Sequence, residues 1–562
     1  MTALDTGAPP SGGTPRAEPF DAAQVDAFVH RLRGGYAQVH PEHWQIDWRS
    51  IPSPFRWYAD LPRIDLPPLS RAAAAGGTAA ARAVAAASPA ARLGGLLQAA
   101  YGVTGVRWYP EGIAKSSPEE PTPVHRNPHY QLRRAVPSGG VTYPAECYLA
   151  TEGTEGIEGI EGTDGLDAGL YHYDAVRHAL AVLSTGSPPA GLAPPRGAVR
   201  VVLTQPLWKN YFKYGDFSYR LGAMDTGAVV GQFALCARSM GLACRVTFST
   251  DERLLLGLLG LDSEEEAAPA VLDVAVGGTG RGPRRASADA AGALAADRPR
   301  WLGASTAPGP DTGTRRMHAA CLAAGRPGRP IDLPPVALET PEGDPGVELP
   351  AVPAQPLSAA ESWTRSALGE QLRGTPIALG VLSGWLTETL APMDCDVPGN
   401  ENRLSHPRCV LLVRSVPGVP AGAYLPDRDG RRLSRLAEGD FGPLVQRSMF
   451  ANYMNVGQAP LVAVMVGAAE PHRGAGGPVA YRVQHLLAGV LAQRLSVCAA
   501  RDGMSAHPVL GFVSGLLDDA IGLARRRLTS LLLVAVGGYR RGLYLENSLN
   551  PSAGAARTGG GR

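Results

Sequence analysis

The pattern of apolar and polar residues predicts one structural unit that occurs twice along the chain. In each unit, a strand of almost unbroken apolar residues (198–205 and 460–467) is followed by a loop. A longer segment then repeats apolar residues every three or four positions, which predicts a helix over 219–241 and another over 481–503. Both segments end in glycine, a residue that often terminates helices. This mixture of helices and strands predicts an α+β fold.

The spacing of short motifs supports a tandem duplication. The sequence VAVGG occurs at 274–278 and again at 534–538. Upstream, SYR at 218–220 corresponds to AYR at 480–482, and the glycines and cysteines that follow each pair keep the same spacing. GLYHYD at 169–174 corresponds in the same way to GAYLPD. A chain of this length exceeds one ordinary core, so two copies of one domain account for it well.

Composition marks the segments that connect these units. Pro, Gly and Ala dominate both ends of the chain and a central stretch, which favours extended or mobile backbone over a packed core. The repeat TEGTEGIEGIEGT at 151–163 lacks aromatic residues, so a flexible loop is expected there. The chain is predicted to divide into five parts: a disordered tail (1–20), a first domain (21–278), a linker rich in Pro and Gly (279–356), a second domain (357–545) and a flexible tail (546–562).

Charge and cysteine content argue against several classes of function. The chain has 53 Lys and Arg against 51 Asp and Glu, a net charge of +2, so nothing indicates a nucleic-acid or membrane partner. No apolar run reaches the length of a membrane span, and the first residues lack the pattern of a secretion signal. The seven cysteines form no CxxC pair, which favours reduced thiols in a cytoplasmic protein.

Two histidine pairs have a spacing that metal sites also use. They are His40 with His43 and His125 with His129, and a proline interrupts each pair. No cysteine or carboxylate cluster completes a set of ligands. The glycine-rich run GGTGRG at 277–282 lacks the Lys-Ser/Thr of a phosphate-binding loop. We therefore expect no metal site and give the glycine-rich run no role.

Chemical candidates occur in the first copy and not in the second. In YFKYGDFSYR, Lys213 and Tyr214 are adjacent and aromatic residues surround them. Aligned on the YR pair, the second copy has Ala475 and Gly476 at these positions. A Lys-Tyr pair is most often solvated surface, but a general acid or base pair, with a Lys pKa lowered by burial, needs the same residues. Its absence from the second copy favours a functional role.

The stretch PSGGVTYP at 137–144 is a second candidate. Pro fixes the chain, while Gly139 and Gly140 let the backbone approach a flat or anionic group closely. Ser138 adds a hydroxyl, and the backbone amides add further donors. An ordinary turn before the strand YPAECYLA explains the same residues.

Arginines accompany both candidates. Arg133 and Arg134 stand immediately before the PSGG stretch, where they would suit a phosphate. Tyr219 and Arg220 open the predicted long helix, and the second copy has the same residue pair. An arginine at this position either holds an anion or pairs with an acid such as Asp225.

The order of these motifs resembles the SagB/McbC-type dehydrogenases of the FMN-dependent nitroreductase-like superfamily. The motifs are LLQAAYGVTG, LRRAVPSGGVTYPAECYLA, GLYHYDAVRHAL, FKYGDFSYR and GAVVGQFALCARSMGLACR. The resemblance is strong over residues 40–278 and weak over 375–540. It implies a nitroreductase-like fold, tandem duplicated with a degenerate second copy, and an FMN-dependent enzyme. Members of this family oxidise peptide thiazolines and oxazolines to thiazoles and oxazoles, and a thiopeptide-type pathway is the expected setting.

The resemblance also assigns residues. Lys213 and Tyr214 match the catalytic pair of the family. Flavin contacts are implied for Arg133, Arg134, Ser138, Gly139, Gly140, Tyr219 and Arg220. The family builds its flavin pocket between two subunits, so the tandem chain would form an internal pseudo-dimer, with a homodimer as a further level of association. The implied partners are an azoline-containing precursor peptide and a cyclodehydratase.

Two other functions remain open at this stage. Degeneracy of the second copy favours a non-catalytic scaffold that docks the precursor peptide or a cyclodehydratase, whereas the intact motifs of the first copy oppose it. An NAD(P)H-dependent nitroreductase is the enzymatic alternative, and bleaching of the flavin by NADPH alone would distinguish it.

Overall fold

A computed structural model of the chain describes most of the two predicted units. The described residues are 14–34, 46, 51–74, 77–109, 129–153, 166–277, 301–302, 308–339, 344–353, 357–367, 371–398, 407–450, 454–540 and 545–548. The histidines at 40, 43 and 125, most of the predicted loop at 151–163, and most of both predicted tails lie outside these residues.

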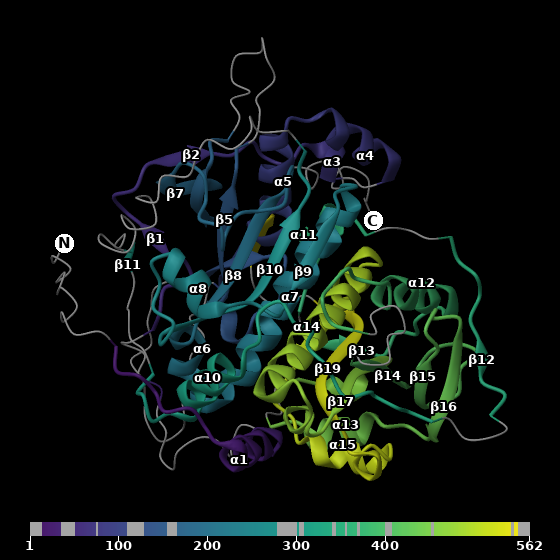
Figure 1. Cartoon of the computed structure of the whole chain (residues 1–562). Coiled ribbons are helices and arrows are strands. Elements are labelled where there is room, and N and C mark those ends of the chain that lie inside the picture. The colour runs from purple at the N-terminus through teal and green to yellow at the C-terminus, as the bar shows by residue number, and fades with distance from the viewer. Residues whose placement is uncertain are drawn as a thin grey trace.

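Two antiparallel sheets with the same strand order form the two halves of the molecule (Figure 1). The first runs in the order β2 (Arg63–Asp65), β7 (Ala179–Thr185), β6 (Gly169–Asp174), β5 (Glu146–Thr151), β8 (Val199–Pro206), β10 (Glu266–Val274) and β9 (Cys244–Thr247). The second runs in the order β12 (Val347–Glu348), β16 (Arg432–Glu438), β15 (Gly422–Pro426), β14 (Arg408–Val413), β17 (Leu461–Ala468), β19 (Leu528–Tyr539) and β13 (Leu372–Arg373), and β18 (Ser505–Val509) also pairs with β19.

The two predicted long helices lie side by side at the centre of the molecule (Figure 1). They are α7 (Ser218–Ser239) and α14 (Gly477–Arg501), within a few residues of the predicted bounds. A Cβ atom on Gly227 would lie 2.0 Å from the carbonyl oxygen of Leu486, and one on Gly489 would lie 2.2 Å from that of Met224. Only glycine permits so close an approach of two backbones. Buried side chains of both halves therefore join in one continuous core.

Each half also contacts the other through a buried arginine at the start of its long helix. Arg220 donates to the carbonyl of Ser530 in β19. Arg482 forms an ion pair with Glu252, whose carboxylate also accepts the amide of Ala268 in β10. These reciprocal contacts relate the two halves by an approximate twofold axis, as the predicted duplication requires.

Strand pairing corrects one detail of the predicted repeat. Val274 of β10 lies opposite Val199, and Val536 of β19 lies opposite Leu461. Because Val199 and Leu461 differ by 262 in number, Val536 is the structural counterpart of Val274. The two VAVGG motifs, 260 residues apart, are thus out of structural register by two residues. The YR pairs, which are 262 apart, are in register.

Shorter elements cover and connect the halves. The helices are α1 (Ala22–Arg33), α3 (Arg71–Ala74), α4 (Gly77–Ala86), α5 (Pro89–Tyr101), α6 (Trp208–Tyr214), α8 (Glu252–Leu258), α10 (Gly313–Ala324), α11 (Ala359–Thr364), α12 (Leu379–Thr389), α13 (Gly442–Ser448) and α15 (Ser514–Ala520). The remaining strands are β1 (Trp57–Tyr58) with β11 (Trp301–Leu302), and β20 (Leu545–Ser548) with β3 (Val103–Tyr109) and β4 (His129–Arg134). Strand β20 thus returns from the second half to pair with the first.

The segment predicted as a linker, 279–356, holds structure of its own. It includes helix α10 and edge strand β12. Ile331, Leu333 and Val336 are buried, so this segment packs against the two halves and is more than a spacer.

Helix α14 is long and apolar enough to cross a membrane, but 94% of its apolar window is buried inside the protein. This is the pattern of a core helix, and its packing against α7 explains the apolar composition.

Candidate functional site

The predicted Lys-Tyr pair and the predicted glycine loop meet in the structure. Gly140 has φ +65°, a left-handed conformation that glycine adopts without strain. A Cβ atom at this position would lie 2.8 Å from the Tyr214 hydroxyl and 3.0 Å from Lys213 Nζ. Both polar groups therefore converge on the backbone of Gly140, although 73 residues separate Gly140 and Lys213 in the sequence.

A short helix aims these two side chains. Helix α6 ends at Gly215, which has φ +50°, and a single 3₁₀ turn then leads into α7. Phe212 and Phe217 are buried and fix this connection in the core, whereas Lys213 and Tyr214 are half-buried. The aromatic residues around the pair thus anchor its backbone.

Asp225 of helix α7 holds the glycine loop in place. Its carboxylate accepts hydrogen bonds from the Ser138 hydroxyl at 3.0 Å and from the Gly139 amide at 3.0 and 3.2 Å. The Ser138 hydroxyl in turn accepts the amide of Tyr143 at 2.8 Å. Burial raises the pKa of Asp225 to about 7, and the donors from Gly139 and Ser138 offset part of that shift. The predicted loop is therefore a rigid turn built on one carboxylate.

Arg134 lies in the core between aromatic rings. Its guanidinium carbon is 3.9 Å from the centre of the Tyr101 ring, 4.8 Å from Phe55 and 5.1 Å from Tyr143. This stacking gives Arg134 a packing role. Its contact with a cofactor phosphate stays a prediction.

A second buried guanidinium, which the sequence did not indicate, lies beside Arg133. Arg365 follows helix α11 in the second half and is 5% exposed. Arg133 donates to the Arg365 carbonyl, and Arg365 Nε donates to the carbonyl of Ala135 at 2.6 Å. Within the described part of the chain, Arg365 Nη1 and the Ser366 hydroxyl have no hydrogen-bond partner and are buried.

Among the described residues, no carboxylate pairs with Arg365. Burial, followed by the charge of Arg133, lowers the pKa of Arg365 to about 9, and Tyr143 offsets part of this shift. A buried cation without a counter-ion is costly, so an anion is expected at this position. No local motif marks Arg365 and Ser366, because their relation to Ala135 arises only when the two halves pack together.

Tyr219 and Arg220 are buried apart from this group. Arg220 Nη1 donates to the carbonyl of Leu32 at 3.2 Å, and its Nη2 donates to the carbonyls of Ser530 and Leu531 in β19. The Tyr219 hydroxyl lies 2.9 Å from Cys321 Sγ. An ion pair of Arg220 with Asp225, one of the two expectations for this arginine, is wrong. The flavin contacts of Tyr219 and Arg220 stay predictions, because protein groups occupy both side chains in the structure.

A buried network of charged residues also contacts the glycine loop, through the Tyr143 carbonyl. This network was not identified from the sequence. Lys209 forms an ion pair with Glu146 at 2.5 Å and donates to the Tyr143 carbonyl at 3.3 Å. His172 lies 3.1 Å from the other carboxylate oxygen of Glu146. Burial opposes ionisation of Glu146, but Lys209 and His172 hold its pKa well below the usual range. These residues come from separate strands and helices, so no sequence spacing reveals them.

In the second half, the chain itself packs against the counterpart of the Lys-Tyr pair. A Cβ atom on Gly476 would lie 2.8 Å from the carbonyl oxygen of Asp332 and 3.5 Å from the Ile331 side chain. Residues 331–333, named the strap here, therefore take the space that a tyrosine side chain would need. The counterpart of the glycine loop, near residue 400, lies outside the described residues.

Comparisons with known proteins agree with this architecture. No family model matches the chain. The trifolitoxin-processing protein TfxB of Rhizobium leguminosarum bv. trifolii is 33% identical over 150 residues, 24% of this chain and 38% of that protein. The match thus covers well under two thirds of that relative.

Solved structures extend the comparison to the whole chain. A protein of Anabaena variabilis described as a nitroreductase is 18% identical and has a TM-score of 0.64, covering 94% of this chain and all of that chain. The Escherichia coli microcin synthetase McbBCD complex, with truncated pro-MccB17 bound, contains a chain 23% identical, covering 33% of this chain and 62% of that chain, with a TM-score of 0.23. The chain has a nitroreductase-like fold, as predicted, with mixed helix and sheet content.

Proposed function

We propose that this chain is an FMN-dependent dehydrogenase that oxidises peptide thiazolines or oxazolines to thiazoles or oxazoles. The observation that carries the proposal is the convergence of Lys213 Nζ and the Tyr214 hydroxyl on Gly140, in a nitroreductase-like fold. The relationship to a trifolitoxin-processing protein supports a peptide substrate. A ribosomally made peptide, such as a thiopeptide precursor, is the proposed setting.

The described residues fit FMN at the junction of the two halves. Gly140 presents bare backbone beside Lys213 Nζ and the Tyr214 hydroxyl, whereas the Leu221 side chain packs against Gly139. The buried donors Arg365 Nη1 and Ser366 Oγ, next to Arg133, suit a phosphate. We assign the ring to the loop of the first half and the phosphate to these donors.

The chemistry then divides among the chain's own groups. Bound FMN supplies the hydride acceptor. Lys213 or Tyr214 removes the acidic proton from the ring carbon next to the substrate carbonyl, since each ends in a group that can take a proton and both reach the same position. Asp225 and the Lys209–Glu146 pair keep the loop fixed, so that the substrate ring and the base stay aligned. Aromatic stabilisation of the azole favours the product.

The substrate implies the partners. An azoline forms when a cysteine, serine or threonine side chain closes onto the preceding carbonyl with loss of water, so a cyclodehydratase must act first. We propose a precursor peptide and such an enzyme as partners, in the cytoplasm. The two halves act as an internal pseudo-dimer, because each contributes part of the proposed FMN site.

A double substitution tests the catalytic pair. Changing Lys213→Ala with Tyr214→Ala should leave FMN bound and abolish azole formation, because the proton acceptors are lost while the loop and Arg365 remain. Flavin absorbance measures the bound FMN. Mass spectrometry of an azoline peptide measures azole formation, because each ring that is oxidised loses two hydrogens. Tyr211→Phe is the matched control, since Tyr211 lies on the same helix but supplies none of the three atoms nearest the Cβ position of Gly140.

Three outcomes would contradict the proposal. Normal turnover by the double variant would remove the Lys213–Tyr214 pair from the mechanism. Purified protein that takes up no flavin would leave the scaffold function as the better interpretation. Bleaching of bound flavin by NADPH alone would point to a nitroreductase.

A further inference from the structure

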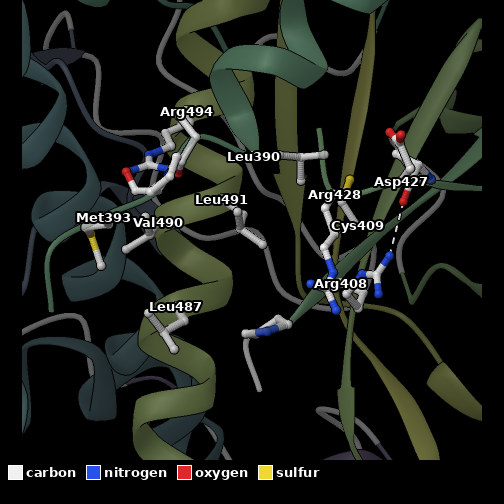
Figure 2. A pocket seen from close by; sticks show the side chains of 14 residues that line it. Leu390, Met393, Arg408, Cys409, Asp427, Arg428, Leu487, Val490, Leu491 and Arg494 are labelled. Carbon is white, nitrogen blue, oxygen red and sulfur yellow. Dashed lines mark hydrogen bonds between the residues drawn. The ribbon is translucent and has the colours of Figure 1, made fainter. Parts of the chain in front are cut away.

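A pocket opens in the second half, on the face of helix α14 that packs toward strand β14 (Figure 2). Leu487, Val490 and Leu491 of α14 supply its apolar wall, and Leu390 and Met393 lie beside them. Arg408, Arg428 and Cys409 lie on the opposite side (Figure 2). Asp427 also lines this side, so the pocket is an apolar space with both basic and acidic groups along one edge.

The corresponding region of the first half holds an aromatic side chain. The register of 262 residues makes Ala145 the counterpart of Pro407, which lines the pocket. The Tyr101 hydroxyl donates to the Ala145 carbonyl at 2.7 Å, and Arg134 stacks on the Tyr101 ring. An aromatic ring with a cation on its face thus lies beside Ala145, the counterpart of the pocket-lining Pro407.

The residues at corresponding positions near this space differ in charge between the halves. The same register pairs Glu146 with Arg408 and Asp225 with Leu487. In the first half Glu146 pairs with Lys209 and His172, and Asp225 holds the glycine loop. The second half offers a cation and an apolar side chain at these positions.

Arg408 lacks a carboxylate partner among the described residues. Its Nη2 donates to the Pro426 carbonyl at 3.1 Å, the hydrogen bond drawn in Figure 2. The neighbouring Asp427 carboxylate instead accepts the amides of Arg431 at 2.6 Å and Arg432 at 3.2 Å. Burial, then the nearby charge of Arg428, lowers the pKa of Arg408, and Cys409 and Asp427 offset part of this shift.

We propose that this pocket binds an aromatic carboxylate. The ring takes the place that Tyr101 has in the first half, against Leu487, Val490 and Leu390, and the carboxylate pairs with Arg408. The source of this group is either a free aromatic acid or the carboxyl-terminal aromatic residue of a peptide. The site is separate from the Lys213–Tyr214 group and does not depend on the proposed function.

Matched ligand pairs test the proposal on the purified full-length protein. Benzoate and N-acetyl-L-phenylalanine should each raise the thermal unfolding temperature in a saturable way, whereas benzamide and N-acetyl-L-phenylalaninamide should not. Tighter binding of N-acetyl-L-phenylalanine than of benzoate identifies a peptide terminus as the source, and the reverse identifies a free acid. Equal effects of acids and amides, or no effect of either, would overturn the proposal even without a variant.

Substitutions place the effect at this pocket. Arg408→Gln should weaken carboxylate binding about tenfold or more, the consequence of losing one charge-assisted hydrogen bond. Leu390→Trp should block the pocket by filling it. Arg431→Gln is the control, because Arg431 is exposed nearby and does not line the pocket. Unchanged binding by folded Arg408→Gln protein would refute the site.

Discussion

Asp225 links the protonation state of a single buried carboxyl to the shape of the candidate site. Its side chain accepts the Ser138 hydroxyl and the Gly139 amide, which together set the turn on which Lys213 and Tyr214 converge. An ionised carboxylate accepts both donors well, but burial disfavours the charge. The pKa of about 7 is the balance of these two effects.

The raised pKa of Asp225 predicts a pH dependence of stability. Because the folded-state pKa, about 7, exceeds the unfolded value, the folded protein binds this proton more tightly. The resulting stabilisation is fully present below about pH 4 and is lost as the pH rises through about 7. Asp225→Asn should remove this loss. The difference in unfolding free energy between the two proteins should therefore change by a total of about 2–4 kcal/mol between these pH values. Chemical denaturation of both proteins across that range measures it, and parallel curves would contradict it.

At the scale of elements, the contact between α7 and α14 is the feature on which the site depends. Glycines at 227 and 489 face the carbonyls of Leu486 and Met224, so the two helices touch backbone to backbone. This approach brings Arg365 of the second half to Ala135 of the first, next to the loop. A small shift of the helices would separate the two parts of the proposed FMN site.

A substitution at this crossing should therefore affect stability strongly. Gly227→Ala places a Cβ atom 2.0 Å from the Leu486 carbonyl oxygen, which the backbone can relieve only by moving the helices apart. We expect a loss of about 3 kcal/mol or more in unfolding free energy, at the upper end of overpacking effects. Gly257→Ala is the control, because nothing lies within 4 Å of its Cβ position in α8, and it should stabilise the protein by about 0.5–1 kcal/mol. Equal effects of the two changes would contradict the tight crossing.

The elements and the candidate Lys-Tyr pair could be identified from the sequence because they depend on local patterns. Apolar spacing predicted α7 and α14, and the loss of Lys-Tyr from the second copy singled out Lys213 and Tyr214. The VAVGG register was wrong by two residues because side chains of a strand alternate with a period of two, so a slip of two keeps the same faces. Arg365 was missed because its environment is formed by the other half of the chain.

At the scale of the whole molecule, the two halves differ in that only the first has the Lys-Tyr pair of the candidate site. The first half supplies the glycine loop with Lys213 and Tyr214, and the second supplies Arg365. At the counterpart position, Gly476 replaces the tyrosine and the strap blocks the space beside it. The halves are thus no longer interchangeable, although their sheets keep the same strand order.

We therefore expect one FMN per chain, bound jointly by the two halves. The flavin-to-protein ratio of the reconstituted protein, from absorbance, should be one, and two would show that the strap does not close the counterpart.

Arg365→Gln should lower the affinity for FMN about ten- to a hundredfold, through loss of a charged hydrogen bond to the phosphate, and leave the affinity for riboflavin unchanged. Arg431→Gln should change neither affinity.

Hydrogen exchange adds an independent result: FMN should protect the amides of residues 138–143 in the first half and leave those of the strap as they were. Exposure of the strap on FMN binding would mean that the second half also takes up flavin, whereas a ratio of zero would count against the proposed function itself.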